Sequence, residues 1–141
     1  MATKKEISIK DYREILNTIE LENICMIDAN FKIDRELLSD EIKLNTKETF
    51  KYEKKDNLLI VFYKTSLKGI DLKTKNAPIS ATITHEITYS MTSEKDITPE
   101  FMNKFGEFST SMAVWPFFRE YVQSMISRTQ LPHLTLPLKK I

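Results

Sequence analysis

The chain has 141 residues, of which 41% are hydrophobic and 29% charged, and its net charge is +1. This length and composition indicate one globular domain over residues 1–141, and a charge so close to zero argues against nucleic acid or an anionic membrane as a partner. The single cysteine, Cys25, excludes an intrachain disulfide and favours the cytoplasm, and the longest apolar run, Leu58–Tyr63, is too short to span a bilayer.

The first elements are a helix followed by a strand. Apolar residues at helical spacing predict an amphipathic helix over Asp11–Glu20, with Ser8 as the candidate N-cap. From Leu21 the apolar period changes to two, which predicts a strand. One face of this strand would carry Leu21, Asn23, Cys25, Ile27, Ala29, Phe31 and Ile33, and the other Glu22, Asp28, Asn30 and Lys32.

Three further strands follow a long polar connection over Asp34–Asp40. The second strand alternates from Ile42 to Tyr52, and the turn cluster Lys54–Asn57 predicts a hairpin to the third, Leu58–Leu67. We interpret the lysines between Lys64 and Lys75 as a solvated loop rather than a basic patch. The fourth strand, Ile79–Met91, alternates so regularly that it predicts an antiparallel sheet with water on one side.

The C-terminal third is helical and unusually aromatic. Thr98 as N-cap and Pro99 at the first position predict a helix start. Because a proline inside a helix costs about 3 kcal/mol, we expect a break near Ser109–Ser111, with Pro116 opening a second helix.

No catalytic or metal-binding constellation is present in the sequence. His85 lies on the apolar face of the fourth strand, where we expect a hydrogen-bonded core histidine, and His133 lies in the terminal loop. Together with Cys25 these residues lack metal-ligand spacing. The run Ser109–Ser111 lacks a base and an orienting acid. We therefore expect neither an enzyme nor a cofactor.

The closing stretch "FFREYVQSMISRTQLPHLTLP" resembles the C-terminal signature of the SecB protein-export chaperones. The matching residues are Trp115, Pro116, Phe117, Arg119, Glu120, Ser124, Met125, Ile126, Ser127, Arg128, Pro132, Leu134 and Leu136. Upstream, "IELENICMIDANFKID" resembles the first strand of the family, and Gly106 lies near a family glycine.

The resemblance implies an α+β fold: a four-stranded antiparallel Greek-key sheet with a short N-terminal helix and a broken C-terminal helix packed on one face. It also implies a dimer or tetramer that holds unfolded polypeptides without ATP and passes them to the SecA motor in protein export. A compact SecB-like member would also suit a toxin–antitoxin or phage role, with an antitoxin as its client. An oligomeric module that binds one folded partner is the alternative.

Two sets of residues would carry this function. The expected oligomer interface comprises Phe101, Phe105, Phe108, Met112, Trp115, Phe118 and Met125. The expected client-binding set comprises Phe117, Tyr121, Leu131, Leu134, Leu136 and Leu138, although the four leucines could instead pack on the protomer's own sheet.

SecA itself is expected to bind weakly or not at all. Family members continue past the Leu-Pro exit into a second helix and a tail, whereas this chain ends at Ile141. The acidic docking positions of the family fall on Asp28, Lys32 and Thr82, so only one of them is acidic here.

Overall fold

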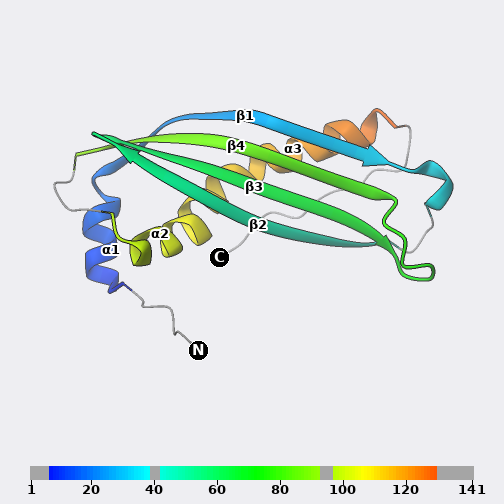
Figure 1. The fold of residues 1–141 in the computed structure, drawn as a ribbon, viewed down its shortest axis with the longest axis horizontal. Coiled ribbons are helices and arrows are strands. Elements are labelled where there is room, and N and C mark those ends of the chain that lie inside the picture. The colour runs from blue at the N-terminus through cyan, green and yellow to red at the C-terminus, as the bar shows by residue number, and fades with distance from the viewer. Residues whose placement is uncertain (1–6, 39–41, 93–96, 130–141) are drawn as a thin grey trace.

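The computed structural model describes residues 7–38, 42–92 and 97–129. A four-stranded antiparallel sheet carries the helices on one face, and no described helix or strand covers its other face, called the open face below (Figure 1). The expected α+β architecture is confirmed. Within the described residues, no helix is both long and apolar enough to cross a membrane.

Helix α1 spans Ile9–Leu16 and begins at the predicted cap, because the side chain of Ser8 accepts a hydrogen bond from the backbone N–H of Asp11. It ends earlier than predicted. Ile19 belongs instead to strand β1, Ile19–Ile33, where its side chain packs against the core.

The sheet has the strand order β1-β4-β3-β2. Strands β2 (Ile42–Lys55), β3 (Leu58–Asp71) and β4 (Ile79–Met91) form consecutive hairpins. Strand β1 pairs with β4, and the connection through the short helix η1 (Arg35–Leu37) leads from β1 to β2 at the opposite edge of the sheet. This arrangement is a Greek key. The β2–β3 turn fits two residues because Asp56 adopts a left-handed φ of 51°, which aspartate tolerates.

Strand β3 is longer than predicted. It continues past Leu67 to Asp71, so Lys64 and Lys68 are strand residues rather than part of a solvated loop. Their neighbours Thr65 and Leu67 are buried under the helices, so the two lysines point to the open face of the sheet.

The predicted alternation of β1 is wrong in its middle section. Register shifts between Leu21 and Asn23, and again between Met26 and Asp28, each insert an extra residue. The first shift reverses the alternation and the second restores it. Ile24 and Met26 therefore face the helices, and the predicted inward residue Cys25 faces the open side, where its Sγ lies 3.9 Å from Oε2 of Glu86.

The C-terminal helical region is continuous rather than broken at Pro116. Helix α2 (Pro99–Lys104) is capped by Thr98. It is followed without a break by a π-helical segment, η2 (Phe105–Thr110), and then by α3 (Ser111–Ser127). The irregularity precedes the proline, and Pro116 lies inside α3. Burial of Trp115 and Phe118 on either side of the proline offsets its cost, which explains why the helix does not end there.

Two buried clusters lie between the sheet and the helices. The first joins α1 and α2 to one end of β3 and β4, and includes Tyr12, Tyr89 and Phe101. The second joins α3 to the other end of the same strands, and includes Leu67, Ile83 and Phe118.

The helix approaches the sheet closely at Gly106. A Cβ at this position would overlap the ring of Phe50 from β2. Glycine is therefore required by space rather than by a special backbone angle.

Candidate functional site

The helix-facing side of β1 is apolar and largely uncovered. Its register partners on β4 face the helices, so Leu21, Ile24 and Met26 share that side with Ala29, Phe31 and Ile33. Leu21 remains 50% exposed and Met26 43% exposed, whereas the corresponding residues of β4 are buried. The helices thus cover β4 and leave the apolar row of the edge strand open.

The flank of α3 that faces this row is also apolar. Phe117, Tyr121 and Met125 lie four residues apart and so share one side of the helix. Phe117 is 50% exposed, and its ring centroid lies 6.2 Å from that of His85. Since His85 is the register partner of Met26, Phe117 and Met26 border the same buried histidine. We call this combination of the β1 row and the α3 flank the β1–α3 groove.

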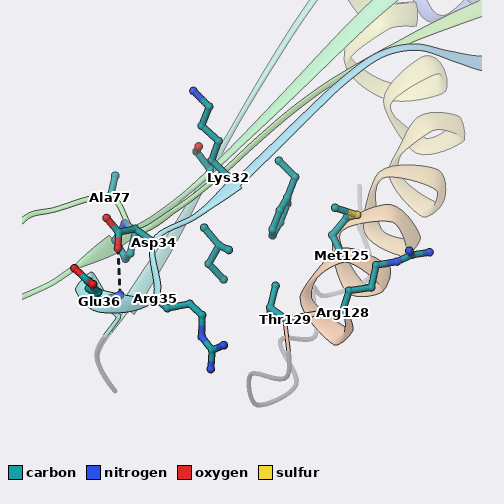
Figure 2. Close-up of a pocket in the computed structure, with 12 residues that line it drawn as sticks. Lys32, Asp34, Arg35, Glu36, Ala77, Met125, Arg128 and Thr129 are labelled. Atoms are coloured by element: carbon teal, nitrogen blue, oxygen red, sulfur yellow. Dashed lines mark hydrogen bonds between the residues drawn. The ribbon is translucent and has the colours of Figure 1, made fainter.

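A surface pocket of about 920 Å³ lies at the far end of this groove. Met125 and Thr129 border it from the end of the helix, and the segment around Asp34 and Arg35 borders it from the opposite side (Figure 2). The side chain of Asp34 accepts a hydrogen bond from the backbone N–H of Glu36, which fixes this rim. Apolar side chains of β1, Phe31 and Ile33, also line the pocket.

His85 is a core residue, as predicted, but it is not satisfied as predicted. Its side chain is only 1% exposed, and its Nδ1 has no hydrogen-bond partner within the described part of the chain. Burial lowers the pKa of the imidazole, so the ring is neutral near pH 7. The hydroxyl of Thr65 is, like Nδ1 of His85, buried without a hydrogen-bond partner among the described residues.

The three consecutive hydroxyls of the helix are structural partners of the sheet and α1. Ser109 hydrogen bonds to the phenol of Tyr12 at 2.9 Å, Thr110 to Tyr89 at 3.1 Å, and Ser111 donates to Glu48 at 3.2 Å. Burial raises the pKa of Tyr89, while the hydrogen bond between Tyr89 and Thr110 opposes that shift. Each hydroxyl is thus engaged in holding the π-helical region to the rest of the protein.

Metal ligation has no support in the described residues, since they contain no group of three histidine, cysteine or acidic side chains placed to hold an ion.

The predicted client-binding residues divide into two groups. Phe117 and Tyr121 line the groove, whereas Leu131, Leu134, Leu136 and Leu138 lie outside the described residues. Sequence reasoning missed the β1 residues Leu21 and Met26 as site residues. Leu21 keeps its predicted face, whereas Met26 is turned to the helix side by the bulge between Leu21 and Asn23, which leaves no local signal in the sequence.

The predicted interface residues also divide. Phe101, Phe105, Trp115 and Phe118 are at most 8% exposed and pack in the protomer's own core. Phe108 and Met112 are 37% and 41% exposed, and Met125 is partly buried at the pocket. Only the exposed side chains are free to contact a second chain, so the interface prediction narrows to them.

Comparison with known proteins identifies the fold. No protein-family model matches the sequence, and no curated protein matches it either. Among solved structures, the chain is similar to the Mycobacterium tuberculosis Rv1957 SecB-like chaperone in complex with a ChAD peptide from the HigA1 antitoxin. The TM-score is 0.79 at 15% identity, over 94% of this chain and 98% of that one.

A second similarity is much weaker. A protein of unknown function from Streptococcus agalactiae aligns over 84% of this chain and 96% of that one, with 10% identity and a TM-score of 0.43.

The sheet order, the helices on one face and the match to the Rv1957 chaperone over nearly the whole of both chains together show that this protein has a SecB-like fold.

Proposed function

We propose that the protein is an ATP-independent chaperone that holds unfolded or extended polypeptides in the β1–α3 groove. The observation that carries this proposal is the uncovered apolar row of β1 beside the exposed Phe117 of α3. Exposed apolar side chains gathered in one place mark a binding surface, whereas scattered ones do not.

The groove fits an extended chain. From Leu21 to Ile33 the row is roughly 40 Å long, enough for about 12 residues of extended polypeptide. Covering the exposed parts of Leu21, Met26 and Phe117 would contribute about 2 kcal/mol each before the cost of association. This sum gives weak, reversible holding, which a client strengthens by also filling the pocket at Met125.

The solved structure with the same fold supports this assignment of function. It is a SecB-like chaperone bound to a peptide from an antitoxin. We therefore propose an antitoxin as a candidate dedicated client here, with the cytoplasm as the place of action. Delivery to SecA is expected to be weak, because Lys32 and Thr82 replace acids on the open sheet face.

Self-association is part of the proposal. Phe108 of η2 and Met112 of α3 are exposed and are not among the groove residues, and a partner chain covering them would form a dimer or tetramer.

The test is suppression of aggregation of a heat-unfolded reporter protein, followed by light scattering. The double variant Met26→Ser, Phe117→Ser should lose most of this suppression, and it should keep its thermal midpoint because both side chains are about half exposed.

A matched control uses equally exposed apolar residues elsewhere. Leu58 is 42% and Leu72 46% exposed, and the variant Leu58→Ser, Leu72→Ser should suppress aggregation like the wild type. Equal loss in both variants would place the holding activity outside the groove. If the wild type suppresses the aggregation of no unfolded reporter and binds one folded protein, the proposed chaperone function is wrong and the protein is instead an interaction module.

A further inference from the structure

The open face of the sheet carries a concentration of lysines that the sequence order conceals. Lys68 of β3 and Lys32 of β1 are both register partners of Ser80 on β4, so they lie roughly 10 Å apart in the same row. One row on, Lys47 of β2 pairs with Ser66. In the row after that, Lys64 of β3 pairs with Thr84. All four lysines are exposed and face away from the helices.

The surroundings leave this charge largely uncompensated. The same three rows contain one acid, Asp28, at the β1 edge, and their other positions are polar and uncharged: Asn30, Asn45, Thr49, Ser66, Ser80, Thr82 and Thr84. No ion pair engages the four lysines within the described residues. Lys43 and Lys51 extend the positive strip at either end along β2, and the row of Lys51 also contains the acid Glu86 on β4. We call Lys32, Lys43, Lys47, Lys51, Lys64 and Lys68 the basic face.

The chemistry of this face favours a carboxylate-rich partner. Lysine ammonium groups attract anions, and the hydroxyl side chains between them donate hydrogen bonds to carboxylate oxygens. Sheets that bind single-stranded nucleic acid instead present several aromatic rings for base stacking. Here the three rows hold no aromatic side chain, and Phe62, in the adjacent row, is partly buried. The face also lacks arginine, the residue best suited to paired contacts with phosphate.

We propose that the basic face is a docking surface for an acidic polypeptide segment, separate from the β1–α3 groove on the other side of the sheet. Its sign is opposite to that of the acidic docking positions that the SecB resemblance implies. A partner that approaches through this face would be selected by charge, whereas a client in the groove would be selected by apolar side chains.

The test measures binding of a fluorescently labelled poly-glutamate peptide to the full chain by anisotropy. The triple variant Lys47→Glu, Lys64→Glu, Lys68→Glu should bind at least about tenfold more weakly than the wild type, since each reversal replaces an attraction by a repulsion. Binding to the wild type should also weaken as ionic strength rises. The neutral triple Lys47→Gln, Lys64→Gln, Lys68→Gln should give an intermediate affinity, and it guards against misfolding caused by charge reversal.

A control with the same change of net charge reverses Lys10, Lys54 and Lys73, which lie outside the basic face. It should bind the peptide like the wild type. The groove variant Met26→Ser, Phe117→Ser should also bind the peptide like the wild type, because its expected loss of aggregation suppression concerns only the β1–α3 groove. Absence of peptide binding at low salt would overturn the proposal. So would equal weakening of binding by the charge reversals in the basic face and by the control reversals of Lys10, Lys54 and Lys73. Tighter binding of single-stranded DNA of equal charge through the same lysines would also overturn it, in favour of a nucleic-acid site.

Discussion

Replacing Gly106 by Ala tests how closely the helix is fitted to the sheet. The added methyl group would overlap the ring of Phe50, whose Cε2 would lie 2.7 Å from it. The ring cannot easily rotate away, because it stacks on Tyr63 with an interplanar angle of 1° and a centroid separation of 6.1 Å. Overpacking of this kind costs about 1–3 kcal/mol. Alanine otherwise stabilises a helix by about 1 kcal/mol relative to glycine, so a clash that costs more than this reverses the normal sign.

A double-mutant cycle separates these two contributions. Gly106→Ala alone should lower the free energy of unfolding by up to about 2 kcal/mol, the overpacking cost less the gain in helix preference. In a Phe50→Ala background, where the obstacle is gone, the same change should raise it by up to about 1 kcal/mol. The measurement is urea unfolding followed by circular dichroism, at one protein concentration so that association does not shift the midpoint.

Ala113→Gly provides the matched control for helix preference within the same helical region, and should cost about 1 kcal/mol. If Gly106→Ala stabilises the protein in both backgrounds, the helix does not touch Phe50 and the close approach is refuted. If it destabilises equally in both, the cause lies in the π-helical backbone and not in the ring.

Three further predictions concern the assembly, a buried hydrogen bond and pH. Met112→Asp should dissociate the proposed oligomer without lowering the stability of the protomer, as measured by light scattering and urea unfolding, and a monomeric wild type would contradict it. Tyr89→Phe removes the 3.1 Å hydrogen bond to Thr110 and should cost about 1–2 kcal/mol in urea unfolding, against almost nothing for the exposed control Tyr52→Phe; equal costs would disprove the role of that bond. Burial lowers the pKa of His85, so at acidic pH the unfolded chain binds a proton that the folded chain does not, and stability should fall as pH drops below about 6.5. His85→Gln should flatten this pH dependence of the free energy of unfolding. An unchanged slope would refute the role of His85 in it.

The elements that the sequence predicts best are those with one strong local signal. Strand β4 has the predicted bounds, Ile79–Met91, because its polar and apolar residues alternate without interruption. The start of α2 follows from Thr98 and Pro99, and the side chain of Thr98 accepts the expected hydrogen bond from the backbone of Phe101. In each case a few adjacent residues determine the geometry, so distant contacts have nothing to override.

Irregular elements could not be predicted, because their causes lie far apart in the sequence. The hydroxyls of Ser109 and Ser111 gain partners from α1 and β2, and these contacts accompany the π-helical segment just before α3. The sequence indicates an interruption in this region. It misleads about Pro116, because the local cost of proline is visible in the sequence and the burial of its neighbours is not.

The bulges of β1 decide which residues form the proposed groove. Apolar side chains occupy both phases of the middle of this strand, with Ile24 and Met26 in one phase and Cys25 and Ile27 in the other, so alternation alone cannot choose between them. Pairing with β4 makes the choice, since the extra residue between Leu21 and Asn23 turns Met26 to the helix side, opposite His85, which contacts Phe117. Without the bulges Cys25 would face the helix there, and the row would present a smaller side chain to a client. The feature that the sequence could not predict is therefore the one that places Met26 in the groove.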